Sequence, residues 1–313
     1  MTQCKKNKGD YTPLVRFNRQ LGPSTYRLGL EFTGDVAQAM ASFRPGQFIE
    51  LDVSCAAVPD HRDIPIHLRD KALRHVLLRR PFSPCSVEAT AGSVRMDIIY
   101  CVIGPATLRM TTLMPGTTVS MLGPLGNGFP CPKGKKTALL VAGGVGTPPI
   151  QHLATDLAAN DEAPQTVFFV GTQTITDPPF EAHTTGKSIT IPELEKHAIE
   201  THIATDDGSA GHRGFVTECL EKWLTNHPDQ DRSKLVSYTC GPEPMLSKVS
   251  HIAEANAIDC YVSLERSMAC GLGLCQSCAV EVRRTNSSET VYKMCCTHGP
   301  VFNANTVIFT NDR

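Results

Sequence analysis

The stretch TALLVAGGVGTPPI, residues 137–150, decides the fold of the second half of the chain. Its first half is a continuous apolar run, typical of a strand buried on both faces of a parallel sheet. The prolines after Thr147 suit the first turn of a helix, where no backbone N–H is needed. Gly143, Gly144 and Gly146 would let a pyrophosphate approach the N–H groups at the helix's positive end. The spacing is G-x-G-x-x-P, not the complete dinucleotide fingerprint, which leaves an ordinary tight turn as the alternative.

Downstream of this stretch, apolar strands alternate with helices. QTVFFVGT, HIATDD and KLVSYTCG have the pattern of strands, and VTECLEKWLTNH and EPMLSKVSHIAEANA that of helices. Such alternation indicates a parallel sheet, so we predict a Rossmann-like α/β domain over residues 134–262 that binds a nicotinamide dinucleotide. Cys240 and Gly241 end one of its strands, where a thiol could lie against a nicotinamide ring. A buried core cysteine is the alternative.

The upstream region, residues 10–133, is rich in β pattern. Runs such as TYRLGLEF and SVRMDIIYCVI are separated by Pro-Gly or Gly-Pro turns, which is typical of an antiparallel β-barrel. A charged segment at 59–79 interrupts the pattern, and we expect it to form a long loop or a helical insertion. Met110, Met114 and Met121 are expected in the barrel core.

The tetrapeptide Arg80-Pro81-Phe82-Ser83 follows the charged segment. An arginine can pair with a flavin phosphate, and a serine hydroxyl or backbone N–H can bond the N5 edge of an isoalloxazine ring. On its own, however, this tetrapeptide is compatible with any strand end.

Five of the 13 cysteines crowd into 27 residues near the C-terminus. In a chain without a secretory signal, such a cluster indicates metal rather than a disulfide framework. The spacing C-x4-C-x2-C, followed by a later cysteine, is that of plant-type [2Fe–2S] sites, whereas a zinc knob and idle thiols are the alternatives. The fourth ligand stays open at this point, because two neighbouring cysteines follow. The clustered residues are Cys270, Cys275, Cys278, Cys295 and Cys296.

Two glycines lie within this cysteine motif. Gly271 and Gly273 would let a tight loop wrap a cluster and point backbone N–H groups at its sulfurs, which raises the reduction potential. We therefore predict a small C-terminal [2Fe–2S] domain over residues 263–313.

Composition and charge exclude several function classes. The chain is 41% hydrophobic and 19% charged, as in soluble globular proteins, and its formal charge of −1 gives no reason to expect nucleic acid or an acidic membrane as a partner. No signal peptide and no run of about 18 apolar residues is visible, so a cytoplasmic location is expected. The 11 histidines show no ligand spacing.

Taken together and in this order, the motifs resemble the ferredoxin–NADP reductase superfamily, in which a flavin-binding barrel precedes a nucleotide domain. Within it, the chain is most similar to the electron-transfer subunits of class B dihydroorotate dehydrogenase, which carry an additional C-terminal [2Fe–2S] domain. The stretches that support this are LLRRPFS, IIYCVIGPAT, LGPLGNGF, LLVAGGVGTPPI, ATDDGSAGHRGFVTE, CGPEPML, MACGLGLCQSC and YKMCCTHGPVF.

The resemblance implies a role for each matching position. It places FAD on a first group of residues, the NAD pyrophosphate and nicotinamide on a second, and the cluster on four cysteines. Cys296 is the implied fourth ligand, because the family's last cysteine lies three residues before Gly-Pro-Val-Phe. Three departures are a lost second glycine in the loop 104–107, a longer insertion before Arg80 and a longer gap between the third and fourth ligands. The implied residues are Arg80, Pro81, Phe82, Ser83, Ile99, Tyr100, Gly104 and Thr107 for FAD, Gly143, Gly144, Gly146, Cys240 and Gly241 for NAD, and Cys270, Cys275, Cys278 and Cys296 for the cluster.

The resemblance also implies an activity. The chain would be an oxidoreductase subunit that exchanges hydride between NAD(H) and FAD and single electrons between FAD and the cluster. An FMN-containing catalytic subunit would oxidise dihydroorotate for pyrimidine (UMP) synthesis, in a heterotetramer. NAD is favoured over NADP because GTQTITDPPFE contains no Arg or Lys. The alternatives are a diaphorase subunit of a sulfite reductase, hydrogenase or transhydrogenase, and a non-enzymatic redox-sensing module.

Overall fold

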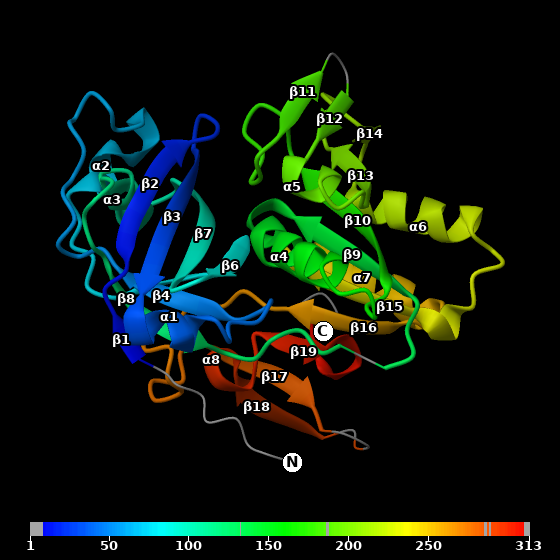
Figure 1. Cartoon of the computed structure of the whole chain (residues 1–313). Coiled ribbons are helices and arrows are strands. Elements are labelled where there is room, and N and C mark those ends of the chain that lie inside the picture. Colours follow the sequence, from blue (N-terminus) through cyan, green and yellow to red (C-terminus); the bar gives the residue numbers. More distant parts are fainter. Residues whose placement is uncertain (1–8, 132, 186–187, 285–286, 288, 310–313) are drawn as a thin grey trace.

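The computed structural model describes residues 9–131, 133–185, 188–284, 287 and 289–309. Three modules follow one another along the chain (Figure 1). The N-terminal module, in blue and cyan, lies beside the central module, in green and yellow, and the orange and red C-terminal module lies below both. Within the described ranges, no helix is long and apolar enough to cross a membrane.

The N-terminal module consists of two four-stranded antiparallel sheets around one apolar core, in agreement with the predicted antiparallel β architecture. One core cluster takes residues from both sheets, such as Leu28 and Met96 from one and Ile49 and Met121 from the other. In order, the first sheet contains β1 (Gly9–Tyr11), β8 (Ser120–Leu125), β4 (Phe48–Asp52) and β5 (Arg80–Phe82), and the second β2 (Leu14–Gln20), β3 (Thr25–Thr33), β7 (Ser93–Cys101) and β6 (Ser86–Thr90). Two short helices, α1 (Gly34–Met40) and α3 (Pro105–Met110), complete the module.

One of the three methionines expected in this core is misplaced by the sequence analysis. Met110 and Met121 are fully buried, but Met114 is 66% exposed. It lies in a turn after α3, in which its backbone carbonyl accepts a hydrogen bond from Thr117 N. The turn directs the side chain to solvent, so the prediction for Met114 is wrong.

The charged segment 59–79 is mostly loop, with a short 3-10 turn, η1 (Ile66–Leu68), that continues into α2 (Arg69–Ala72). Ile64, Leu68 and Val76 are buried in the core of the N-terminal module. These three apolar residues hold the insertion on the module. The prediction of a long loop or helical insertion is therefore confirmed in both of its parts.

The central module is built on a seven-stranded sheet with the order β14-β13-β10-β9-β15-β16-β19. All of its strand pairs are parallel except the last, in which β19 runs antiparallel to β16. A Rossmann-like parallel sheet was predicted, and it is confirmed. The strands are β9 (Thr137–Gly143), β10 (Gln165–Thr172), β13 (Glu200–Thr205), β14 (His212–Arg213), β15 (Leu235–Cys240), β16 (Asp259–Ser263) and β19 (Val301–Asn303).

Helices cover both faces of this sheet, as the continuous apolar strands require. In β9, Leu140 faces α4 while Leu139 and Val141 face α6 and α7, because successive strand residues point to opposite faces. The helices are α4 (Thr147–Ala158), α5 (Pro192–Glu195), α6 (Val216–Asn226) and α7 (Glu243–Ala255). Three further short elements are η2 (Gly144–Gly146), η3 (Arg232–Lys234) and the hairpin β11 (His183–Thr185) with β12 (Ser188–Thr190).

The C-terminal module is a hairpin followed by one helical turn and a strand. It contains β17 (Ala279–Arg283), β18 (Thr290–Met294), α8 (Cys295–His298), β19 and η4 (Ala304–Thr306). Because β19 pairs with β16, the C-terminal module adds a strand to the central sheet, which the sequence analysis did not predict. The hairpin residues Val280 and Val282 belong to the same apolar cluster as Leu139 of the central sheet.

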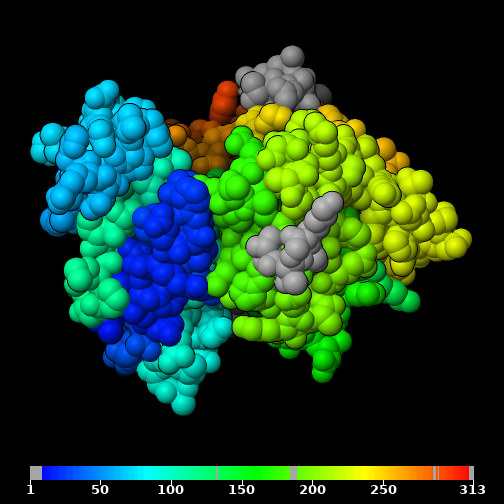
Figure 2. Space-filling model, turned by 90° about the horizontal axis from the view of Figure 1, so that it is seen from above, coloured from blue at the N-terminus to red at the C-terminus, as the bar shows by residue number. Residues whose placement is uncertain are grey.

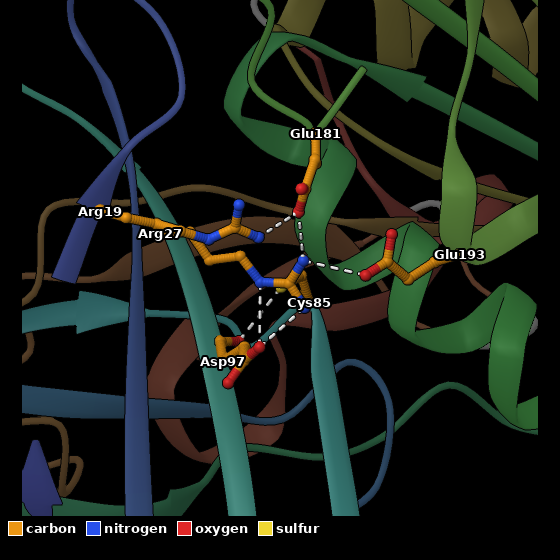
Figure 3. A network of polar contacts seen from close by, with 6 residues as sticks. All are labelled: Arg19, Arg27, Cys85, Asp97, Glu181 and Glu193. Atoms are coloured by element: carbon orange, nitrogen blue, oxygen red, sulfur yellow. Dashed lines mark hydrogen bonds and ion pairs between the residues drawn. The ribbon is translucent and has the colours of Figure 1, made fainter. Parts of the chain in front are cut away.

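The N-terminal module, in blue, lies directly against the central module, in green, when the molecule is seen from above (Figure 2). Arg27 of β3 is the centre of a charged network between the two modules (Figure 3). The Arg27 side chain is only 8% exposed. Its guanidinium forms ion pairs with Asp97 of the same module at 2.7 Å, and with Glu181 and Glu193 of the central module at 2.7 and 2.9 Å. Burial raises the pKa of Asp97 and Arg27 opposes that rise. A buried cation with three carboxylate partners therefore joins the two modules.

A second contact acts beside the first. The Asp177 carboxylate, from the segment that follows β10, accepts hydrogen bonds from the backbone N–H groups of Ser24 and Thr25, at the start of β3. Both contacts fasten the segment between β10 and α5 to the N-terminal module.

Replacing Arg27 by methionine tests this interface. The variant removes the cation that the three carboxylates share and leaves the buried Asp97 without its ion pair, so we expect the free energy of unfolding to fall by about 3–5 kcal/mol. Urea unfolding followed by the fluorescence of Trp223, the single tryptophan, measures it, since this side chain is buried in α6.

Arg19→Met is the matched control. Arg19 also pairs with Glu181, but its side chain is 48% exposed, and loss of such a pair costs about 0–1 kcal/mol. If both variants lower the free energy of unfolding by the same small amount, Arg27 does not hold the two modules together.

Candidate functional site

The predicted flavin motif, Arg80–Ser83, begins with strand β5 at the edge of its sheet. Its register on β4 places Arg80 opposite Leu51 and Phe82 opposite Ile49. All four residues of the motif are half-buried. The Arg80 guanidinium donates to the carbonyl oxygens of Leu78 and Arg79, at 2.9 and 3.2 Å.

Ile99 and Tyr100 come from β7, in the other sheet of the module, and both are buried. The structure brings Tyr100 to the flavin motif, because its ring meets that of Phe82 edge-on at 6.4 Å. The Tyr100 hydroxyl donates to Asn18 Oδ1 at 3.1 Å, and burial raises the pKa of this phenol. Asn18 thus fixes Tyr100, a role for which the sequence offered no signal.

Gly104 and Thr107 form the start of α3. The Thr107 hydroxyl accepts hydrogen bonds from the backbone N–H groups of Ile103 and Gly104, at 3.0 and 3.2 Å. Pro105 occupies the first turn, where its missing N–H is not needed. The loop therefore keeps a closed helical turn although its second glycine is lost.

The glycines of the predicted NAD loop lie where β9 ends and α4 begins. Gly144 has a φ of +53°, which favours glycine. A Cβ on Gly146 would lie 2.3 Å from the carbonyl carbon of Cys240, so only glycine fits there. Cys240 and Gly241 end the adjacent strand β15, and the structure thus brings the two predicted NAD segments into direct contact.

This contact lies at a topological switch point of the sheet. The chain passes from β9 to β10 on one side and returns to β15 on the other. In open parallel sheets the crevice at the carboxyl ends of such strands is the usual ligand-binding position. The arrangement therefore fits a dinucleotide laid across the ends of β9 and β15.

The first two predicted cluster cysteines lie in an irregular loop and are close together. Cys270 Sγ accepts hydrogen bonds from the backbone N–H groups of Leu272 and Cys275, at 3.5 and 3.4 Å. The Ser277 hydroxyl and backbone N–H, followed by Cys270, lower the pKa of Cys275 to about 6. A depressed thiol pKa favours the thiolate form, which is the form that binds metal.

Backbone conformations that favour glycine shape this loop. Gly271 and Gly273 have φ values of +61° and +85°, and Gln276 adopts +60° without being a glycine. Positive φ at a non-glycine residue is strained, and such strain is concentrated at functional sites.

The other two cysteines form a second, buried pair. Cys278 Sγ accepts a hydrogen bond from Cys296 N at 3.4 Å, and the two residues are 2% and 1% exposed. The hairpin explains the pair, since β17 and β18 pair from Ala279 opposite Met294, next to the two cysteines. Cys295 Sγ instead donates to the carbonyl oxygen of Leu264 at 3.4 Å, outside the pair.

The paired arrangement is a test of which metal group fits. Among the residues that the structure describes, no group of three or more His, Cys, Asp or Glu side chains is close enough to hold one metal ion. Each iron of a [2Fe–2S] cluster takes two thiolates. Two pairs of thiols, with backbone N–H groups directed at Cys270 and Cys278, therefore fit a two-iron cluster.

Asn127 joins the C-terminal module to the N-terminal one. Its side-chain amide donates to the carbonyl oxygens of His298 and Val301, at 3.1 and 2.8 Å, and its Oδ1 accepts from Val301 N at 3.0 Å. Asn127 lies in the stretch LGPLGNGF and its partners in THGPVF, two of the stretches that carried the resemblance. Sequence reasoning noted both stretches but not that they touch.

Comparisons with known proteins agree with this geometry. Residues 265–308 match the model of the iron–sulfur cluster binding domain of dihydroorotate dehydrogenase B, and residues 140–251 match that of an oxidoreductase NAD-binding domain. Among solved structures, an NADH-dependent reduced ferredoxin–NADP oxidoreductase aligns with a TM-score of 0.70 at 22% identity, over 97% of this chain and 92% of that chain. Phthalate dioxygenase reductase aligns with a TM-score of 0.56 at 15% identity, over 88% and 87%. These likenesses show the fold.

Curated relatives are more similar in sequence. The dihydroorotate dehydrogenase B (NAD(+)) electron transfer subunit of Bacillus caldolyticus is 37% identical over 94% of this chain and 96% of its own length. The subunit of the same name from Listeria monocytogenes is 35% identical, over 86% and 89%. With this identity over nearly its whole length, the chain belongs to the family of dihydroorotate dehydrogenase B electron transfer subunits.

Proposed function

We propose that this chain passes electrons between NAD(H) and an FMN-containing dihydroorotate dehydrogenase subunit, through FAD and one [2Fe–2S] cluster, in pyrimidine synthesis. The observation that carries the proposal is the position of the paired thiols. Their loop packs against strand β4, which is the hydrogen-bonded neighbour of the flavin-motif strand β5. The names of the relatives support a dihydroorotate dehydrogenase as the partner and NAD⁺ as the nucleotide.

The overall reaction fixes what the chain must supply. Dihydroorotate loses two electrons and two protons in becoming orotate, and NAD⁺ takes up both electrons and one proton as hydride. FAD, when bound, exchanges hydride with nicotinamide and single electrons with the cluster. This chain's residues bind these groups, orient them and exclude water from them.

The division of labour among modules is also a proposal. Residues 10–133 hold FAD, residues 134–262 hold NAD and residues 263–313 hold the cluster. We assign FAD to Arg80, Pro81, Phe82, Ser83, Ile99, Tyr100, Gly104 and Thr107, NAD to Gly143, Gly144, Gly146, Cys240 and Gly241, and the cluster to Cys270, Cys275, Cys278 and Cys296.

NAD rather than NADP suits the segment after β10. Residues 171–181 contain no Lys or Arg that could pair with a 2′-phosphate, and Asp177 and Glu181 in this segment face the N-terminal module instead. A heterotetramer with the catalytic subunit and a cytoplasmic location, where thiols stay reduced, complete the proposal.

Serine variants of the two adjacent cysteines test the cluster assignment. We expect Cys296→Ser to lose most of the iron and sulfide and the visible absorbance of the cluster, because the Cys296 backbone N–H donates to Cys278 Sγ and its thiol interacts with the same sulfur. Cys295→Ser is the matched control and should keep both, because Cys295 hydrogen-bonds Leu264 instead. Iron analysis and absorbance of anaerobically purified protein measure the effect, and the reverse pattern would overturn the ligand set.

Co-expression with the FMN-containing subunit from the same source tests the function. The purified complex should reduce NAD⁺ with dihydroorotate, and Cys275→Ser should lower this rate at least 100-fold because it breaks the cluster path. The same variant should keep most of its NADH oxidation with an artificial acceptor that takes electrons from flavin. NADH oxidation without binding of that subunit would refute the dihydroorotate assignment and point to a sulfite reductase or hydrogenase partner.

A further inference from the structure

A buried carboxylate lies between the flavin motif and the cysteine loop. Glu50 of β4 is 1% exposed, and its Oε1 has no hydrogen-bond partner among the residues that the structure describes. A carboxylate without a partner in a protein interior is costly. None of the residues assigned to FAD, NAD or the cluster accounts for this buried carboxylate.

The direction of the side chain follows from strand geometry. Successive residues of β4 point to opposite faces, and Ile49 and Leu51 enter the core of the N-terminal module. Phe48 belongs to the apolar cluster shared with the central and C-terminal modules. Glu50 lies on the same face of β4 as Phe48. Its polar side chain therefore points toward the C-terminal module.

Glu50 meets the cysteine loop at Gly271. A Cβ placed on Gly271 would lie 2.8 Å from the carboxylate carbon of Glu50 and within 3.0 Å of both of its oxygens. The carboxylate is thus packed onto the backbone next to Cys270, and glycine is required at 271 both for this approach and for its φ of +61°.

The same carboxylate is coupled to the flavin motif. Glu50 is the cross-strand partner of Pro81, within that motif. Burial raises the pKa of Glu50, and Arg79 opposes this, while Cys275 raises the pKa further and Arg80 lowers it. Glu50 therefore interacts with charged groups of both the flavin motif and the cluster ligands.

We infer that Glu50 is a positioning residue that seats the cysteine loop against the flavin strand and, by its negative charge, lowers the reduction potential of the cluster. The inference rests on the proposed function. Reduction adds an electron to the cluster, and a nearby buried negative charge opposes that addition. The arrangement would keep electrons from being trapped on the cluster on their way to or from FAD.

Redox titration of the holoprotein tests the charge. Glu50→Gln preserves the shape of the side chain and removes the charge, so the midpoint potential of the cluster, followed by the EPR signal of its reduced form, should shift upward. The titration is made in mildly alkaline buffer, because burial raises the pKa of this carboxyl and a higher pH favours its ionised form. Glu50→Asp keeps the charge and should stay nearer to the wild type. Glu88→Gln, an exposed carboxylate on β6, is the control and should leave the potential unchanged.

The outcomes separate this inference from the proposed function. Equal potentials in Glu50→Gln and wild type, or an equal upward shift in Glu50→Asp and Glu50→Gln, would overturn the role of the charge. A wild-type protein that holds no iron or sulfide would instead overturn the proposed function. Gly271→Ala tests the seating: we expect it to lower cluster content, and Glu50→Ala in the same chain should restore part of it by making room for the methyl group. If the double variant holds as little cluster as Gly271→Ala alone, the contact between Glu50 and Gly271 is contradicted.

Discussion

The apolar cluster that all three modules share is the constraint on which the rest of the structure depends. It takes Phe48 and Leu125 from one sheet of the N-terminal module, Leu139 from the central sheet, and Val280 of β17 and Cys296 of α8 from the C-terminal module. A segment of the size of the C-terminal module buries too little surface to be stable alone. By sharing a core it gains stability, and its cysteine loop is fixed beside the flavin-motif sheet. Electron transfer between two bound groups needs such a fixed separation.

Apolar contact is non-directional, so it does not by itself set how the modules are oriented. Polar contacts between the modules set that orientation. Arg27 fixes the central module on the N-terminal one with two ion pairs and holds a third within its own module, and Asn127 fixes the chain around Pro300 with three hydrogen bonds. These groups are costly to bury unless each finds its partner, so they favour one arrangement over its neighbours. The apolar core brings the modules together, and these contacts select their relative position.

Local chemistry was predictable from the sequence, and long-range contacts were not. Periodicity identified the parallel sheet and the helices on it, and spacing identified the cysteine motif, because both depend on residues close together in the chain. The strand β19 is three residues long and its partner β16 is about 40 residues earlier, so no local pattern reveals the pairing. The same holds for Arg27, whose carboxylate partners at 181 and 193 lie in another module, and for Glu50 against Gly271. Met114 was misplaced because a turn, and not its apolarity, decides where its side chain points.

We infer that electrons from NADH reach the cluster through this chain. Anaerobic addition of NADH to the isolated holoprotein tests this path, with the cluster followed by EPR at low temperature and the flavin by absorbance. We expect the signal of the reduced [2Fe–2S] cluster to develop with NADH alone, without a mediator or a partner subunit. A flavin that bleaches with NADH, beside a cluster that is reduced by dithionite only, would contradict it.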